Sequence, residues 1–101
     1  MIYRARTITL GGVNIGEAKH IMVRAAAYLN ENYPEIDVEI LENIGGPLQQ
    51  LHMVTKCNSL AALEAYEEKR QGDAEWNAIL AEWNAFAVGS TTEDHLYRII
   101  S

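Results

Sequence analysis

The sequence has one cysteine and few basic residues. Cys57 has no partner for an intrachain disulfide, and a single thiol cannot build a zinc cluster on thiolates. Eight Lys and Arg residues stand against fourteen Asp and Glu residues, which gives a formal net charge of −6. Such a charge repels a phosphate backbone, so we expect no nucleic-acid partner. The scarcity of cysteine suits a reducing compartment and favours a cytoplasmic location.

Long apolar runs are also missing. No uninterrupted stretch approaches the ~18 residues of a membrane span, and the residues after Met1 alternate instead of forming the apolar block of a signal peptide. Hydrophobic residues still make up 49% of the 101 residues, which is ordinary for a globular protein. We therefore expect one soluble domain over residues 1–101, with no membrane partner.

Hydrophobic periodicity predicts a mixture of strands and helices. β-branched and apolar residues alternate with polar ones in four segments, which we expect to be strands at 2–10, 37–44, 48–57 and 93–100. Asn14, either Asn58 or Ser59, and Asp73 are the expected N-caps of three helices. The first helix should end before Pro34, because the residue before a proline avoids the helical region.

Gly45 and Gly46 are expected to form a two-residue hairpin loop, because glycine adopts the positive φ that such turns need. The register expected from this loop pairs Ile44 with Pro47, Ile40 with Leu51, and Val38 with Met53. Directly opposed residues share a face of the sheet, so the apolar halves of both strands coincide. Leu51, Met53 and Cys57 should then face the helices.

This order of elements is a split pair of βαβ units, the ferredoxin-like pattern of an α+β fold. Right-handed crossovers place the helices on one face of a four-stranded antiparallel sheet with spatial order 4-1-3-2. The other face is expected to hold Arg4, Arg6, Ile8, Glu39, Leu41, Leu48, Gln50, His52 and Val54. Several of these are apolar, so we expect a second copy to cover the face. Such a homodimer would enclose a small barrel-like cavity between its paired sheets.

Several short motifs resemble the NIPSNAP-like proteins. Ala5-Arg6-Thr7-Ile8-Thr9-Leu10 resembles the opening Leu-Arg-Thr-Tyr-Thr signature, with Ile8 in place of the aromatic residue. Leu51-His52-Met53-Val54 and Ser59-Leu60-Ala61 resemble the third strand and following helix of that family. The resemblance implies the dimeric α+β-barrel superfamily, which also contains cofactor-independent monooxygenases and haem-degrading enzymes. The haem-degrading branch uses an Asn on the first strand, which is missing here, and we expect no cofactor.

His52 is the titratable residue of greatest interest, because histidine titrates near neutral pH and this one lies in the middle of a strand, near Arg4 and Arg6. It is a candidate general base in an enclosed cavity. The alternative is a structural histidine that bonds to Glu39 or Gln50.

Arg4 and Arg6 are candidates for binding a carboxylate or another anion, since a guanidinium fork matches that geometry. The alternative is an ion pair with Glu39 or Glu42 across a subunit interface. The full expected ligand-binding set is Arg4, Arg6, Gln50, His52, His95 and Tyr97. The last two belong to it only if their face of the final strand is the open one.

Two other groups of residues invite a cofactor or metal hypothesis. A metal site from His52, His95 and Glu39 or Glu42 has no close ligand spacing behind it, and we expect no metal. Trp76 and Trp83 lie seven residues apart on one helical face, where core packing is the expected role.

Three functions remain open from the sequence. The first is a homodimeric barrel that binds a small, partly apolar molecule, either neutral or anionic. The second is a cofactor-independent monooxygenase or an isomerase-type enzyme that uses His52. The third is a structural or interaction protein whose barrel is filled by side chains.

Overall fold

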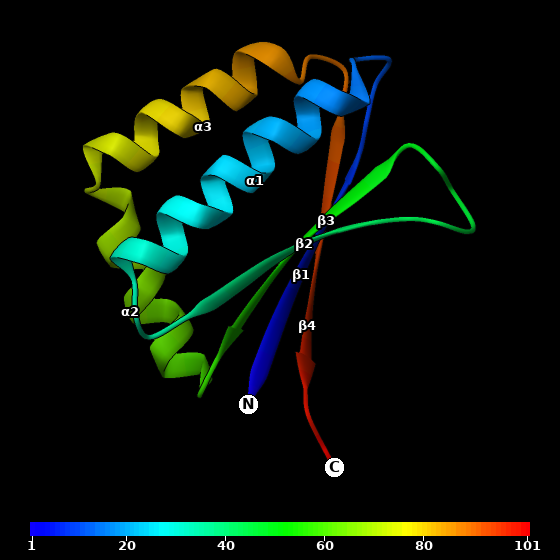
Figure 1. The fold of residues 1–101 in the computed structure, drawn as a ribbon. Helices are drawn as coiled ribbons and strands as arrows, with labels where there is room; N and C mark the ends of the chain where they lie inside the picture. Colours follow the sequence, from blue (N-terminus) through cyan, green and yellow to red (C-terminus); the bar gives the residue numbers. More distant parts are fainter.

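The computed structural model describes residues 1–101 as four strands and three helices (Figure 1). The strands are β1 (Ile2–Thr9), β2 (Asp37–Glu42), β3 (Gln50–Cys57) and β4 (Thr91–Arg98), and the helices are α1 (Ile15–Asn32), α2 (Leu60–Gln71) and α3 (Ala74–Phe86). The sheet order is β2-β3-β1-β4, and every neighbouring pair is antiparallel. All helices lie on one side of the sheet (Figure 1). The predicted ferredoxin-like α+β fold is confirmed.

The helices begin where their capping residues predict. Asn14 Oδ1 accepts a hydrogen bond from the backbone N–H of Glu17 at 2.9 Å, and Ser59 caps α2 in the same way. Asp73 caps α3 and also accepts hydrogen bonds from the hydroxyls of Tyr28 and Tyr33, at 2.6 and 2.7 Å. One carboxylate therefore holds the start of α3 against the end of α1, and these bonds lower its pKa.

The core lies between the helices and one face of the sheet. Leu29 from α1, Leu51 from β3 and Tyr66 from α2 are fully buried there. Cys57 is also buried on this side, as its place in the strand predicted. None of the helices combines the length and the apolar character needed to cross a membrane.

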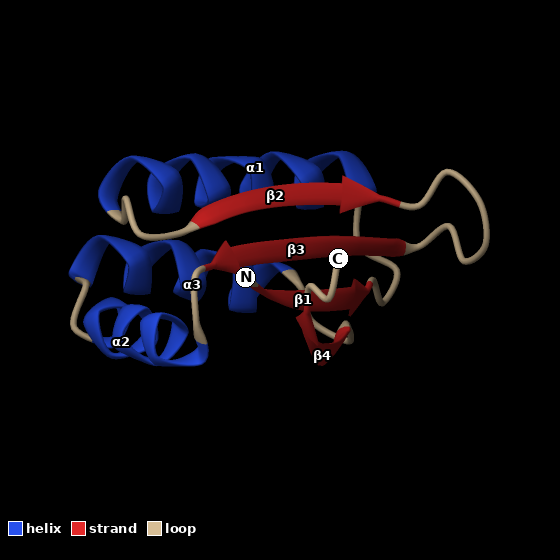
Figure 2. Ribbon diagram, turned by 90° about the horizontal axis from the view of Figure 1, so that it is seen from below, coloured by secondary structure: helices blue, strands red, loops and turns tan.

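The turn between β2 and β3 differs from the predicted hairpin. Ile40 pairs with Met53 instead of Leu51, and the connection spans residues 43–49, not two glycines. The longer loop projects from the body of the molecule (Figures 1 and 2). The Asn43 side chain donates to the carbonyl of Pro47 at 2.5 Å and so closes the loop. The register shifts by an even number of residues, so each side chain keeps its predicted face.

The two faces of β1 are the reverse of those predicted. Ile8 pairs with Leu51 and Arg6 pairs with Met53, and directly opposed residues share a face. The face that carries Arg4, Arg6 and Ile8 is therefore the one covered by helices. The open face carries the alternate residues of β1, which are Tyr3, Ala5, Thr7 and Thr9.

Two loops meet at one end of the sheet through a close backbone approach. A Cβ atom on Gly11 would lie 2.2 Å from the carbonyl oxygen of Gly89, so no larger residue fits there without a backbone shift. The N–H of Gly11 donates to Ser90 Oγ at 3.1 Å. The contact ties the start of β4 to the end of β1.

Candidate functional site

A pocket lies between the helix-covered face of the sheet and helices α1 and α3. It has a volume of about 130 Å³. We call it the apolar pocket; its walls are Ile8, Ile21, Met22, Ala25, Met53, Trp76, Ile79, Leu80 and Trp83, with Arg6, Asn84 and Thr92 as polar members. Trp76 and Trp83 pack with the core, as predicted, and also form one wall of this pocket. Pockets that are mostly apolar with a few polar groups are typical small-molecule sites.

A second, wider hollow lies beside the apolar pocket, under α2 and next to β4. Its volume is about 510 Å³. We call it the charged hollow; it is lined by Arg4, Arg6, Arg70, Glu64, Glu67, Asp94, Leu60, Leu63 and Leu96. Arg6 lines both spaces, so the apolar pocket and the charged hollow adjoin at this residue.

Arg4 is the most buried charged residue of the chain, with 6% of its surface exposed. Its Nη1 donates to Glu67 Oε1, whereas its buried Nε has no hydrogen-bond acceptor. Burial, and then the nearby charges of Arg6 and Arg70, lower the pKa of this guanidinium. The site therefore contains a buried cation whose hydrogen-bonding capacity is only partly used.

Arg6, by contrast, binds a carboxylate through two of its nitrogens. Its Nε and Nη2 donate to the two carboxylate oxygens of Asp94, both at 2.8 Å. This fork raises the pKa of Arg6 and lowers the pKa of Asp94. The pair joins β1 to the edge strand β4 across the charged hollow.

Arg70 has no carboxylate partner. Its Nη1 donates to the Tyr66 hydroxyl at 2.9 Å, and its guanidinium carbon lies 4.9 Å from the Tyr66 ring centroid and 5.1 Å from that of Trp76. Stacking on two aromatic rings fixes the position of this cation without neutralising it. Trp76 also lines the apolar pocket, so it is a second link between the two spaces.

The open face of the sheet carries a hydrogen-bonded network around His52. Asn43 uses its amide nitrogen to bond to Pro47 and Gln50, so its oxygen is an acceptor and His52 Nε2 donates to it at 2.5 Å. The other ring nitrogen, Nδ1, lies 2.9 Å from Thr7 Oγ1 and accepts from that hydroxyl when the ring is neutral. His52 is thus held by Thr7 and Asn43, not by the predicted Glu39 or Gln50.

The structure divides the predicted ligand-binding residues between the two faces. Gln50, His52, His95 and Tyr97 share the open face, because His95 pairs with Ala5 and Tyr97 with Tyr3. Arg4 and Arg6 lie on the helix-covered face, so the prediction that they share a cavity wall with His52 is wrong. Their partners are Glu67 and Asp94 of the same chain.

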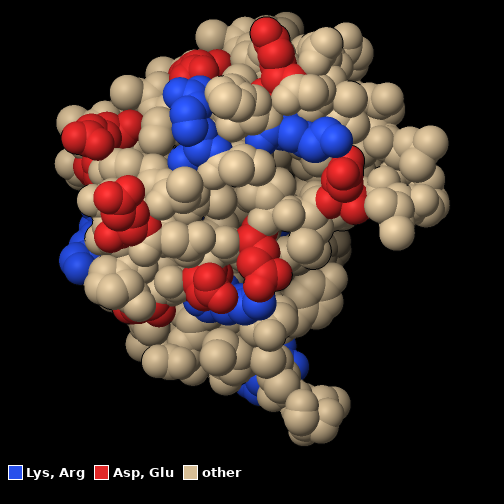
Figure 3. All heavy atoms as spheres, viewed as in Figure 1, with Lys and Arg blue, Asp and Glu red and all other residues tan.

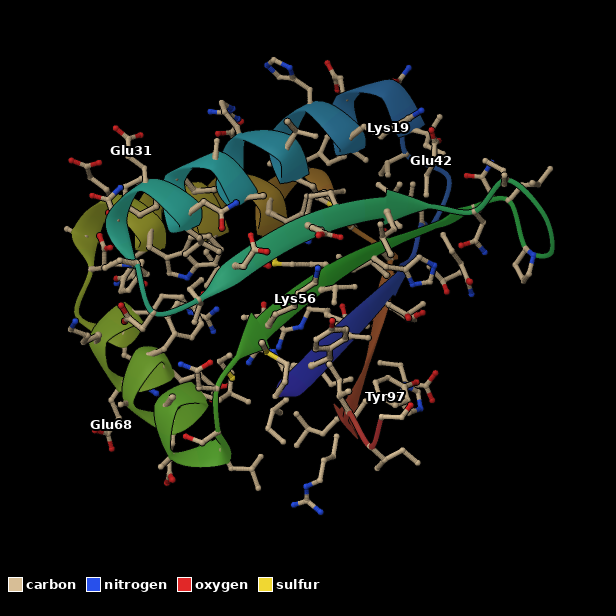
Figure 4. The ribbon with its side chains drawn as sticks, turned by 60° about the horizontal axis from the view of Figure 1, so that its bottom comes forward. Lys19, Glu31, Glu42, Lys56, Glu68 and Tyr97 are labelled. Carbon is tan, nitrogen blue, oxygen red and sulfur yellow. The ribbon has the colours of Figure 1, made fainter.

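The acidic residues of β2 have other partners than the predicted arginines. Glu39 accepts from Lys56 at 2.5 Å, and Glu42 accepts from Lys19 at 2.8 Å, where the two side chains lie side by side (Figure 4). Over the face drawn in Figure 3, basic and acidic side chains are interspersed. The chain holds no group of three or more His, Cys, Asp or Glu side chains placed to bind a metal ion.

The sequence prediction missed Glu67 and Arg70, which complete the charged hollow, and Thr7 and Asn43, which hold His52. Glu67 and Arg70 are three residues apart on α2, which places them on one side of that helix. That spacing was a usable signal. Thr7 and Asn43 had none, because their role depends on the strand register and on the shape of the loop.

No protein-family model matches the sequence, and no curated protein matches it. Solved structures do share its fold. A NIPSNAP family protein with unknown function from Agrobacterium tumefaciens has a TM-score of 0.75 at 16% identity, over 100% of this chain and 91% of that chain. An uncharacterized NIPSNAP domain protein from Burkholderia xenovorans has a TM-score of 0.77 at 12% identity, over 100% and 98%.

SnoaB, a cofactor-independent oxygenase from Streptomyces nogalater, also shares the fold. Its TM-score is 0.70 at 14% identity, over 99% of this chain and 93% of that chain. The predicted resemblance to NIPSNAP-like proteins is confirmed at the level of the fold, and the oxygenase has the same fold.

Proposed function

We propose that this protein binds a small, largely apolar organic molecule in the apolar pocket, between its sheet and its helices. The observation that carries the proposal is the pocket itself, which combines two tryptophans and several aliphatic walls with Arg6, Asn84 and Thr92 at its polar side. A volume of about 130 Å³ suits a single aromatic ring, since a dry apolar cavity of ~150 Å³ holds benzene. The ligand thus lies inside one chain and not between two paired sheets.

Tryptophan fluorescence offers a direct test, because Trp76 and Trp83 line the pocket. Benzene and phenylacetamide are neutral probes with a single aromatic ring, and naphthalene is a neutral probe with two fused rings. We expect a saturable change in emission with the single-ring probes. Absence of saturable binding across the whole series would overturn the proposal.

A pair of variants on β4 controls for nonspecific binding. Thr92 is exposed at the polar side of the pocket, whereas its neighbour Thr91 lies on the other face of the same strand. Thr92→Phe should obstruct the pocket and weaken binding of phenylacetamide at least about tenfold, a loss typical of a blocked site. Thr91→Phe should leave binding unchanged.

The second part of the proposal is that two copies associate through the open face of the sheet. That face carries Leu41 and Tyr97, which are 45% and 54% exposed, beside the half-buried Tyr3 and Val54. An exposed sheet face with this apolar content is typical of an interface. Light scattering at micromolar concentration should give about twice the chain mass of 11.3 kDa. A single species of about 11 kDa would contradict the proposed dimer.

A cofactor-independent oxygenase is the second candidate function, and its support is the fold shared with SnoaB together with the ordered His52. An oxygenase without a cofactor needs a substrate that itself supplies electrons to dioxygen, such as a phenol in its ionised form. Oxygen uptake with a panel of naphthols tests it. Uptake that survives in His52→Ala would remove this histidine from the reaction. A dimer that neither binds the probes nor consumes oxygen would favour the interaction protein.

A further inference from the structure

We infer that the ligand of this protein carries a carboxylate, and that this carboxylate replaces Glu67 on the buried guanidinium of Arg4. The inference rests on the proposed function and adds the chemical class of the ligand. Its basis is the geometry of the charged hollow, where Arg4, Arg6 and Arg70 converge beside the apolar pocket.

The buried guanidinium of Arg4 has more hydrogen-bond donors than the chain has acceptors for them. Arg4 bonds to Glu67 through one nitrogen, and its Nε is buried without any acceptor. A buried donor that lacks a partner costs free energy, and a planar carboxylate is the group that engages a guanidinium through two parallel bonds. Arg6, on the same strand as Arg4, makes these two parallel bonds with Asp94 of β4.

Glu67 is free to leave Arg4, whereas Asp94 in the same hollow is fixed. Its side chain is 41% exposed and lies on the surface helix α2, so it can rotate into solvent without disturbing the core. Asp94 is held by two hydrogen bonds to Arg6. A carboxylate that enters the hollow therefore competes with Glu67 for Arg4, and Arg70, which has no carboxylate partner, adds attraction.

Charge balance favours a monoanion over a phosphate dianion. The hollow is lined by three arginines and by three acids, Glu64, Glu67 and Asp94. A monocarboxylate that takes the place of Glu67 keeps one anion on Arg4, whereas a dianion adds a charge that the neighbouring acids repel. Trp76 touches Arg70 and lines the apolar pocket, so the apolar body of the ligand extends from the carboxylate toward this ring.

Phenylacetate and phenylacetamide test the inference as a matched pair, since they differ in charge and hardly in shape. Wild type should bind phenylacetate more tightly, and inorganic phosphate should compete poorly. Glu67→Gln should bind phenylacetate about tenfold more tightly than wild type, because the internal competitor is gone. Phenylacetamide should bind both proteins equally.

Glu64→Gln is the control, because Glu64 lines the same hollow and makes no ion pair. Its effect on phenylacetate affinity should stay within about twofold, the scale of a screened surface charge. Equal gains in Glu64→Gln and Glu67→Gln would reduce the effect to net charge and overturn the inference. So would a preference for phenylacetamide, or for phosphate, in the wild type.

Arg4→Met removes the cation itself, and should lower phenylacetate affinity to that of phenylacetamide while tryptophan emission without ligand reports that the protein is folded. If this variant does not fold, the comparison of Glu67→Gln with Glu64→Gln decides alone. Phenylacetamide that binds without any carboxylate preference would keep the proposed function and overturn only this inference. If phenylacetate binds to wild type and Thr92→Phe has no effect on that binding, the apolar pocket is not the binding site. That result would overturn the proposed function and keep the contact between the carboxylate and Arg4.

Discussion

Both faces of the sheet carry polar groups, but the two faces hold them in different ways. On the helix-covered face, Arg4 and Arg6 are paired with acids from α2 and β4, which are 63 and 88 residues away in the sequence. On the open face, His52 bonds to Thr7 on the adjacent strand and to Asn43 in the adjoining loop. The buried Arg4 thus has its partner on a helix packed over the sheet, whereas His52 needs only the adjacent strand and the adjoining loop. Polarity alone does not identify which face is buried.

The largest contrast should appear between Leu51 and Val54, which lie on opposite faces of β3. Leu51 is fully buried against the helices, so Leu51→Ala should lower the free energy of unfolding by about 2–5 kcal/mol. Val54 is only half-buried, and Val54→Ala should cost about 1 kcal/mol. Urea denaturation measures both. Equal losses would mean that the open face is as well covered as the other, which is the outcome of a tight dimer.

The next contrast concerns the acids of α2. Glu67→Gln leaves the buried Arg4 with a weaker acceptor, and we expect a loss of about 1–2 kcal/mol, less than for a fully buried pair because Glu67 is partly exposed. Its neighbour Glu68 points away from the sheet (Figure 4), and Glu68→Gln should change stability by less than about 0.5 kcal/mol. Thermal unfolding ranks the two variants, and a reversed order would contradict the role given to Arg4.

A smaller loss is expected from the open face. At concentrations where the protein is monomeric, His52→Ala breaks two hydrogen bonds, but the half-exposed Thr7 and Asn43 regain water as a partner. We expect a loss of about 1 kcal/mol in urea denaturation. A much larger loss would show that the network is buried in solution, and a variant made in a monomeric background would then separate the dimer from the fold.

The smallest effect is the pH dependence that comes from Asp94. The pKa of Asp94 is lowered in the folded state by its bonds to Arg6, so its contribution is present above the unfolded value of about 3.9 and is lost as the pH falls through the folded value. The side chain is 42% exposed, so the contribution should stay below about 1 kcal/mol. Asp94→Asn should flatten the dependence of stability on pH below pH ~4, which urea denaturation at a series of pH values measures.

Local signals in the sequence were sufficient for the elements and their order. Asn14, Ser59 and Asp73 cap helices through contacts within three residues, and Pro34 ends one by sterics. These effects need no knowledge of the rest of the chain, and the sheet order then follows from the handedness of the crossovers.

Local signals were not sufficient to predict which face each residue of β1 occupies, or the length of the loop between β2 and β3. Ile8 and Arg6 alternate on one face with Thr7 on the other, and the pattern does not say whether an arginine is buried until its acid is known. The loop depended on the Asn43 side chain, which replaces a turn that the two glycines favoured. The prediction of the candidate site was the least accurate part, because it placed Arg4 and Arg6 on the open face of the sheet.

The central place of β1 has a consequence for how the protein is made on the ribosome. This strand is translated well before β4, yet β4 is the neighbour on one of its edges, and Asp94 comes 88 residues after Arg6. Contacts this distant in sequence slow folding, because a long loop must close before they form. Until β4 emerges, a nascent chain exposes the free edge of β1 with its isoleucines, and such an edge pairs readily with other chains. We therefore expect chains stalled before residue 91 to aggregate and to depend on chaperones.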